Sequence, residues 1–209
     1  MNTNIVFLGD SITDAGRNLT SGCPYSIGQG YAMIVQAKLG SSEPRQHKFF
    51  NFGVSGERVV DVYAQIKTRC WNNTPDVVSL FVGINDVLHE YENGNGVDAD
   101  RFDKVYRMLV SDTLSRFPKV KFILIAPFIL PGEYLDRSGV CAATETKRRA
   151  DIVFSIGKEF GFPVVNTQAL FDEACKAAPS DFWSVDGIHP TPEGHQLIAD
   201  AWLDAYKTL

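Results

Sequence analysis

The stretch Asn4-Ile5-Val6-Phe7-Leu8 is a short and almost continuously apolar run, and Gly9-Asp10-Ser11-Ile12 follows it directly. Such a run is typical of a parallel strand that is covered on both faces, because a half-exposed strand would alternate apolar and polar residues. A glycine followed by Asp and Ser is typical of a tight turn that caps a helix. The beginning of the chain therefore predicts one strand–turn–helix unit of an α/β fold.

Similar units recur along the rest of the sequence. We expect strands at Asn4–Leu8, Lys48–Phe52, Asp76–Val82, Lys121–Ala126 and Pro163–Asn166. We expect helices at Tyr31–Leu39, Val59–Lys67, Ala99–Phe117, Ala142–Phe160 and from about Pro192 to Lys207, and surface loops at Tyr91–Gly96 and Ile129–Val140. This alternation predicts a three-layer αβα, flavodoxin-like sandwich with a five-stranded parallel sheet. We expect one domain, residues 1–209, because no linker or repeat divides the chain.

Length, composition and charge restrict the classes of partner. The 209 residues are 44% hydrophobic and carry a formal net charge of −5. A chain of this length buries about 70% of the surface of its unfolded form, so its core needs neither disulfides nor a metal. The acidic balance disfavours nucleic acid, and no apolar run approaches the roughly 20 residues of a membrane span. We therefore expect no nucleic-acid or membrane partner, and leave a homo-oligomer open.

The cysteines and the start of the chain indicate a reducing compartment. The cysteines have no short paired spacing of the kind that zinc sites use, and they stand at Cys23, Cys70, Cys141 and Cys175. We interpret them as reduced, mostly packed thiols. Because a predicted strand begins at Asn4, soon after Met1, we expect no secretory signal and a cytoplasmic location.

Four polar blocks follow the predicted strands or precede the last helix, at the edge where ligands bind in such sheets. They are Gly9-Asp10-Ser11-Ile12, Gly53-Val54-Ser55-Gly56, Gly83-Ile84-Asn85-Asp86 and Asp186-Gly187-Ile188-His189-Pro190. Each block alone is an ordinary turn, helix cap or locally paired histidine. Together they place a hydroxyl, backbone amides, a carboxamide and an Asp/His pair at one end of one sheet. Nucleophilic acyl transfer requires such a set.

In this order, the four blocks resemble those of the SGNH (GDSL-type) hydrolases. The longer stretches Gly9–Arg17, Gly28–Tyr31 and Gly83–Val87 are similar to a bacterial branch of that family that includes acetylxylan esterases. The resemblance extends from residue 9 to residue 190, which is most of the chain. It implies the SGNH hydrolase fold and a carboxylic-ester hydrolase that needs no metal or organic cofactor.

The resemblance also implies roles for individual residues. Ser11 would be the nucleophile, His189 the general base, and Asp186 the carboxylate that orients the base. The oxyanion hole would consist of the backbone N–H groups of Ser11 and Gly56 and the side-chain amide of Asn85.

Several neighbours of the blocks are candidates for binding substrate: Asp10, Asp14, Arg58, Asp86 and Trp183. We expect Asp10 chiefly to brace the turn at the nucleophile. Asp14, Arg58 and Asp86 are equally well interpreted as supporting or surface groups. Trp183 and its neighbour Phe182 either wall an acyl or sugar pocket or pack in the core. His195, inside the last helix, is interpreted as structural or exposed.

We therefore expect a serine esterase that acts through an acyl-Ser11 intermediate on a small-molecule ester. The branch-level resemblance implies a short acyl group and the deacetylation of a sugar or oligosaccharide. Two alternatives stay open. One is a lipase, thioesterase or lysophospholipase-type acylhydrolase of the same family, and the other is a non-catalytic flavodoxin-like module that binds carbohydrate.

Three further classes agree less well with the sequence. A conventional α/β-hydrolase marks its nucleophile with G-x-S-x-G, and no serine here has that setting. A metal-dependent phosphoesterase would need histidine ligands near the Gly9 and Gly83 turns, and His89 is the only histidine near either. The stretch Gly28-Gln29-Gly30 is too short for a dinucleotide fingerprint and does not follow a strand directly.

Overall fold

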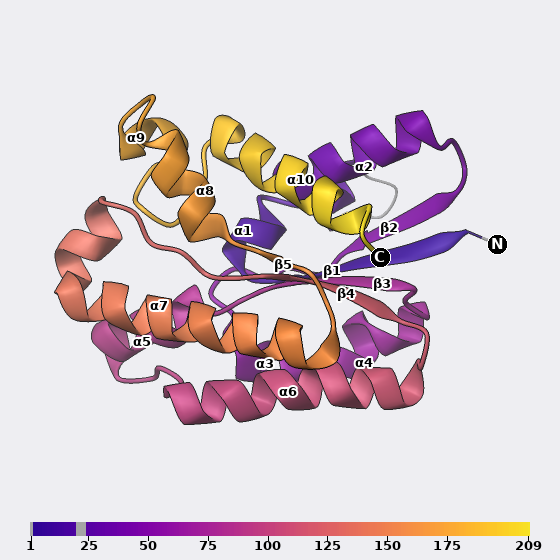
Figure 1. The fold of residues 1–209 in the computed structure, drawn as a ribbon, viewed down its shortest axis with the longest axis horizontal. Coiled ribbons are helices and arrows are strands. Elements are labelled where there is room, and N and C mark those ends of the chain that lie inside the picture. Colours follow the sequence, from indigo (N-terminus) through magenta and orange to yellow (C-terminus); the bar gives the residue numbers. More distant parts are fainter. Residues whose placement is uncertain (1, 20–23) are drawn as a thin grey trace.

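The computed structural model describes residues 2–19 and 24–209. The strands form one parallel sheet in the order β2-β1-β3-β4-β5 (Figure 1). Their bounds are β1 (Thr3–Gly9), β2 (His47–Asn51), β3 (Val77–Phe81), β4 (Lys121–Ile125) and β5 (Val164–Val165). This order confirms the predicted α/β fold with a five-stranded parallel sheet. It also places β1 between β2 and β3, so the turns that follow these three strands lie at neighbouring points of one edge.

Helices cover both faces of the sheet, and the three layers are visible in Figure 1. One face is covered by α2 (Tyr31–Ser42), α8 (Thr167–Ala174) and α10 (Pro192–Tyr206). The opposite face is covered by α3 (Val59–Ala64), α4 (Ile66–Arg69), α6 (Ala99–Arg116) and α7 (Glu133–Phe160). The remaining helical segments are α1 (Ser11–Asp14), η1 (Pro24–Ile27), η2 (Trp71–Asn73), α5 (Ile84–Asn93) and α9 (Ser180–Trp183).

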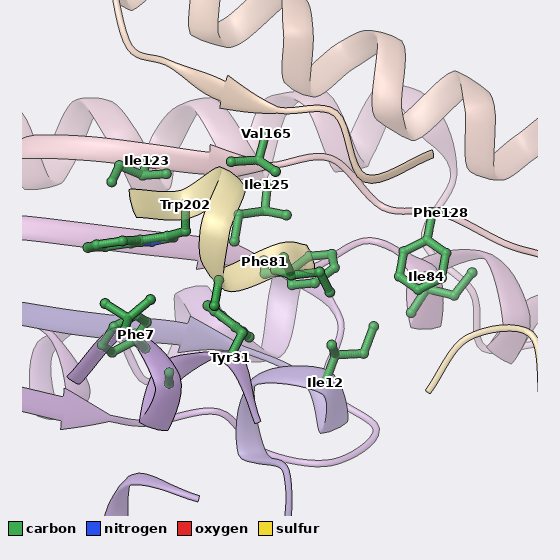
Figure 2. Packing of buried hydrophobic residues seen from close by; sticks show 14 of the residues in the cluster. Phe7, Ile12, Tyr31, Phe81, Ile84, Ile123, Ile125, Phe128, Val165 and Trp202 are labelled. Carbon is green, nitrogen blue, oxygen red and sulfur yellow. The ribbon is translucent and has the colours of Figure 1, made fainter. Parts of the chain in front are cut away.

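The core explains why β1 is apolar from Ile5 to Leu8. Ile5 and Phe7 point to the layer of α2 and α10, where the ring centroid of Phe7 lies 5.6 Å from that of Trp202 (Figure 2). Val6 and Leu8 point to the layer of α3 and α6. All four strand residues are at most 1% exposed. Each contributes roughly 1.5–3 kcal/mol by burial, so both faces of this strand hold the layers together.

Helix boundaries differ from the expectation in two regions. The predicted loop Ile129–Val140 is helical from Glu133 onward, and α7 bends at Gly139, where φ is 73° and ψ is −177°. The loop interpretation was wrong there because this glycine interrupts the helical pattern without ending the helix. The predicted loop Tyr91–Gly96 likewise begins inside α5, which ends at Asn93. The sequence analysis also missed α5 and α8, whose short lengths give few turns of apolar periodicity.

The cysteines that the structure describes are free thiols: Cys70, Cys141 and Cys175. Burial raises the pKa of Cys70 to about 12. Cys23 lies outside the described residues. Within residues 2–19 and 24–209, no cluster of three or more His, Cys, Asp or Glu side chains is arranged to hold a metal ion. No helix of this part of the chain has the length and apolar character that crossing a membrane requires.

Candidate active site

The turn after β1 exposes Ser11 at the carboxyl edge of the sheet. Gly9 is required here because a Cβ would lie 2.3 Å from the carbonyl oxygen of Phe81 and 2.3 Å from Oγ1 of Thr13. The side chain of Asp10 then accepts a hydrogen bond from the backbone N–H of Ile12 at 3.0 Å and caps α1. A close strand-to-strand approach and a cap therefore set the position of the serine.

Ser11, His189 and Asp186 form a continuous hydrogen-bonded chain. Oγ of Ser11 lies 2.8 Å from Nε2 of His189, and Nδ1 of His189 lies 2.6 Å from Oδ2 of Asp186. A carboxylate accepts the Nδ1 proton, so Nε2 is left to accept the hydroxyl proton of Ser11. The structure thus brings together side chains that are 178 positions apart in the sequence.

Asp186 is held in its ionised form. Its second oxygen, Oδ1, accepts hydrogen bonds from the backbone N–H groups of Ile188 at 3.0 Å and His189 at 2.9 Å. Burial alone would raise the pKa of Asp186, but the bonds from the His189 ring and from these two amides together lower the pKa below its ordinary value. A permanent negative charge beside the imidazole stabilises its protonated form.

The loop that carries Asp186 and His189 is fixed at several points. Ser184 accepts a hydrogen bond from the backbone N–H of Gly187 at 3.0 Å. From the segment after β4, the N–H of Leu130 donates to the carbonyl of Gly187 at 2.9 Å, and the N–H of Tyr134 donates to the carbonyl of Asp186 at 3.1 Å. The segment that begins α7 is therefore a structural support for the base.

One aromatic side chain, Tyr134, packs against His189, and two more, Phe182 and Trp183, stand in the segment before its loop. The ring of Tyr134 lies edge-on to the His189 ring, with 6.0 Å between centroids. Tyr134 was hidden in a segment interpreted as a loop, and no motif marks it. Trp183 is half-buried and donates from Nε1 to the carbonyl of Ala178 at 3.1 Å, while Phe182 packs edge-on against it and is 48% exposed.

The two other proposed oxyanion donors lie in the turns after β2 and β3. Gly56 has a φ of +81°, and a Cβ there would meet no atom within 4 Å. Asn85, in the first turn of α5, donates from Nδ2 to the carbonyl of Glu57 at 3.2 Å. Because a carboxamide has two N–H groups, this contact leaves the second N–H of Asn85 for another acceptor. Asn85 therefore lies beside the chain segment of Gly56.

Two acidic candidates, Asp10 and Asp86, are buried beneath the site and are each 1% exposed. Burial raises the pKa of Asp10 to about 7 and that of Asp86 to about 8. Both carboxyl oxygens of Asp86 accept from the backbone N–H of Val59, at 3.1 Å each. These side chains are placed to support the surrounding turns from below.

Asp14 and Arg58 each have an ionic partner close to them in sequence. Oδ1 of Asp14 lies 3.3 Å from Nε of Arg17. Arg58 donates from Nε to Asp61 at 2.8 Å and from Nη1 to the carbonyl of Asn95 at 2.6 Å. In this structure their charges are engaged in holding the turns around the site.

His195 is buried and structural rather than exposed. Its side chain accepts a hydrogen bond at Nδ1 from the backbone N–H of Tyr31, at 3.2 Å. Burial, followed by the nearby charge of His189, lowers the pKa of His195 to about 4. The imidazole is therefore neutral near pH 7 and joins α10 to the start of α2.

A family model places the chain among known proteins. The model of the GDSL-like lipase/acylhydrolase family matches residues 7–197. The chain belongs to this family. As a GDSL-like acylhydrolase it is a carboxylic-ester hydrolase, and the fold described above is that of the SGNH hydrolases.

Relatives of this GDSL-like acylhydrolase include sugar esterases. An acetylxylan esterase of Geobacillus stearothermophilus is 32% identical over 95% of this chain and 91% of its own. The structure of Axe2, an acetylxylan esterase of that organism, has a TM-score of 0.86 at 30% identity and covers 98% of this chain and 95% of its own. LAE5, an α/β hydrolase from the Lake Arreo metagenome, has a TM-score of 0.87 at 29% identity. This match covers 97% of this chain and 94% of LAE5.

Axe2 has been solved as catalytic mutants in which a serine, an aspartate or a histidine is replaced by alanine. In that enzyme the aspartate stands three positions before the histidine. Asp186 and His189 of this GDSL-like acylhydrolase have the same separation.

Proposed function

We propose that this GDSL-like acylhydrolase cleaves carboxylic esters through a covalent acyl-Ser11 intermediate. The observation that carries the proposal is the chain of short hydrogen bonds from Oγ of Ser11 through His189 to Asp186, at 2.8 and 2.6 Å. A hydroxyl that donates to a neutral imidazole, itself oriented by a carboxylate, is an activated nucleophile. The alcohol would leave first, and water would then release the acid.

In the first half-reaction, Oγ of Ser11 attacks the ester carbonyl carbon and its proton moves to Nε2 of His189. The negative charge that develops on the carbonyl oxygen is stabilised by the backbone N–H groups of Ser11 and Gly56 and by the side-chain amide of Asn85. The tetrahedral intermediate collapses, and His189 protonates the departing alkoxide. Asp186 stabilises the imidazolium throughout and keeps its own negative charge.

In the second half-reaction, water takes the place of the alcohol. His189 removes a proton from this water while its oxygen attacks the acyl-Ser11 carbonyl. The same donors stabilise the second oxyanion, and the ester bond to Oγ breaks as His189 returns the proton to Ser11. The free acid leaves, and the hydrogen-bonded chain of the resting enzyme is restored.

The proposed substrate is an acetylated sugar or oligosaccharide. The support comes from relatives of nearly full length, namely an acetylxylan esterase and Axe2, which is also described as an acetyl-xylooligosaccharide esterase. The aromatic ring of Tyr134 beside His189, and that of Trp183 in the segment before the His189 loop, suit the apolar face of a sugar ring. A short acyl group is part of the same proposal.

The mechanism is tested by Ser11→Ala with p-nitrophenyl acetate as substrate. We expect turnover to fall by about 10⁴-fold or more, because the acyl-enzyme cannot form, while the thermal midpoint changes little. A fluorophosphonate probe should label the unsubstituted protein at Ser11 and leave the variant unlabelled. Undiminished turnover in the variant would contradict the mechanism, and an unlabelled, inactive natural chain would favour the carbohydrate-binding module.

The substrate class is tested separately with p-nitrophenyl esters of increasing acyl length and with peracetylated xylobiose. We expect the highest kcat/KM for acetyl and the release of acetate from the sugar. Preference for long acyl chains would instead favour the lipase or thioesterase alternative. The cytoplasmic location stays a prediction, which cell fractionation followed by immunodetection would test.

A further inference from the structure

The proposed oxyanion donors Gly56 and Asn85 belong to turns on strands that do not pair with each other. The Gly56 turn follows β2 and the Asn85 turn follows β3, but β1 lies between these strands in the sheet. Strand pairing therefore fixes the distance between the two donors only through a third strand. An oxyanion hole requires its donors to converge within a few tenths of an ångström, so a direct connection between the two turns has catalytic value.

Asp86 makes such a connection. It follows Asn85 directly in the first turn of α5, and its two carboxyl oxygens accept from the N–H of Val59 at 3.1 Å each. Val59 is the first residue of α3, three positions after Gly56. Arg58, the residue at the N-cap of α3, has no side-chain acceptor, and Asp61 accepts the N–H of Arg58 itself, so the buried N–H of Val59 needs an acceptor from elsewhere. Asp86 supplies it across the site.

The connection through Asp86 is the buried one. The contact of Arg58 with the carbonyl of Asn95 reaches the segment after α5 and not the Asn85 turn, and it lies at an exposed position. The contact of Asn85 with the carbonyl of Glu57 uses one N–H of the side-chain amide, and the other N–H of that amide is the proposed oxyanion donor. Asp86 is 1% exposed, and both of its carboxyl oxygens accept the N–H of Val59.

We propose that Asp86 is a positioning residue that holds the oxyanion donors Gly56 and Asn85 at their catalytic separation by accepting the N–H of Val59. This inference rests on the proposed function. It requires an acceptor atom at position 86 rather than a negative charge, and it requires the N–H of residue 59. Each requirement can be removed by itself.

The first experiment removes the acceptor. With p-nitrophenyl acetate, Asp86→Ala should lower kcat about 10- to 100-fold and leave KM within about threefold, because the donors act on the transition state. Asp86→Asn keeps an acceptor oxygen and should retain kcat within about fivefold. Asn166→Ala removes the cap of α8, which follows the edge strand β5, and should reduce stability without changing kcat. An unchanged kcat in Asp86→Ala, or an equal loss in Asp86→Asn, would overturn the proposal.

The second experiment removes the donor and remains informative if Asp86→Ala does not fold. Val59→Pro deletes the N–H, and proline fits the first position of a helix after a residue as extended as Arg58, at φ −100° and ψ 172°. Val59→Ala, which keeps the N–H and also loses side-chain volume, is the reference. We expect kcat of Val59→Pro to be about 10- to 100-fold below that reference. Equal kcat in the two variants would contradict the role of the connection.

A third measurement separates positioning from a general structural effect. Asn85→Ala alone should lower kcat about 100- to 1,000-fold. If Asp86 acts through the oxyanion donors, adding Asp86→Ala to Asn85→Ala should lower kcat by clearly less than Asp86→Ala does alone, because one of the two donors that Asp86 positions is already lost, whereas independent effects would multiply. Multiplication would overturn the positioning role. Failure of the proposed function would be recognised differently, by full activity in Ser11→Ala.

Discussion

Gly56 combines a left-handed backbone with open space around its missing side chain. Its φ is +81°, yet a Cβ there would meet no atom within 4 Å. The requirement for glycine is therefore conformational and not steric, in contrast to Gly9, where a Cβ would collide with Phe81 and Thr13. Because the backbone N–H of Gly56 is a proposed oxyanion donor, a change of its φ would also redirect that N–H.

Gly56→Ala should therefore reduce both stability and rate. We expect the free energy of unfolding to fall by about 1–2 kcal/mol, because a side chain disfavours positive φ, and kcat to fall about tenfold as the turn relaxes. Gly40→Ala is the matched control, since Gly40 lies inside α2 and its Cβ would also meet nothing within 4 Å. That change should stabilise by about 0.5–1 kcal/mol and leave kcat unaltered. Identical kinetics in both variants would refute the argument.

At this scale the sequence allowed the proposed catalytic side chains to be named, but not the residues that support them. Ser11, Asp186 and His189 stand in blocks whose residue types and order are specific, and the structure brings them within hydrogen-bond distance. Tyr134 and the contact of Asp86 with Val59 depend on how distant segments meet in space. No local sequence pattern predicts contacts between distant segments, so these contacts could not be found from the sequence.

Among the elements, α10 is the one whose start was read most directly from the sequence. Thr191 caps it by accepting from the N–H of Gly194 at 3.2 Å, and Pro192 occupies the first turn. The hydroxyl of Thr191 also donates to the carbonyl of Phe182 at 2.8 Å. This one side chain joins the start of α10 to the end of α9, next to the loop of the base.

Thr191→Ala should lower the free energy of unfolding by about 1–2 kcal/mol, because the helix end loses its cap and Phe182 loses a donor. Thr191→Ser keeps the hydroxyl and should lose only a few tenths of a kcal/mol. Urea unfolding followed by circular dichroism measures both. A loss of similar size in the serine variant would show that the methyl group, and not the hydroxyl, stabilises the helix end.

Elements of regular pattern were predictable, and interrupted ones were not. The strands matched the expected runs within one or two residues at each end, since continuous burial leaves a continuous apolar run. In α7, Gly139 adopts a non-helical conformation inside the helix, so the segment before it lacked the pattern of a helix that continues. Likewise the expected helix Val59–Lys67 is divided into α3 and α4 at Gln65.

For the whole molecule, two core clusters share one sheet, and we propose that residues 1–209 form one domain. The number of protons bound by its buried ionisable groups differs between the folded and unfolded states. Asp10 and Asp86 have raised pKa values, about 7 and about 8, and His195 has a lowered pKa, about 4. Each of these differences makes the free energy of unfolding depend on pH.

As the pH rises, the two buried carboxyl groups and His195 change the free energy of unfolding in opposite directions. Between about pH 4 and pH 7–8, Asp10 and Asp86 keep a proton in the folded state that they lose on unfolding, so they destabilise the fold as pH rises. His195 acts oppositely from about pH 4 to 6.5, because unfolding lets it take up a proton. Above pH 6.5 His195 no longer changes the stability with pH, and only the effect of the two carboxyl groups remains. We therefore expect the free energy of unfolding to fall from pH 6.5 to 8, by up to about 1.4 kcal/mol per pH unit for each carboxyl.

Urea unfolding at a series of pH values measures this slope. Asp86→Asn should flatten it, because an amide does not titrate, and Asp10→Asn should flatten its lower part. Asp204→Asn, at an ion-paired surface position, serves as the control and should keep the slope of the natural protein. A free energy of unfolding that rises from pH 6.5 to 8 in the natural protein would contradict the assignment of these buried protons.

The separation of nucleophile and base along the chain has a consequence for biosynthesis. Ser11 follows β1 and is made long before His189, which comes 178 residues later, and α10 must still pack Trp202 against Phe7. A nascent chain that lacks these last segments has a serine without a base and an open core. Ester hydrolysis by this protein therefore requires that the chain through α10 has been made and folded, and a nascent chain that stops before His189 is inactive toward esters.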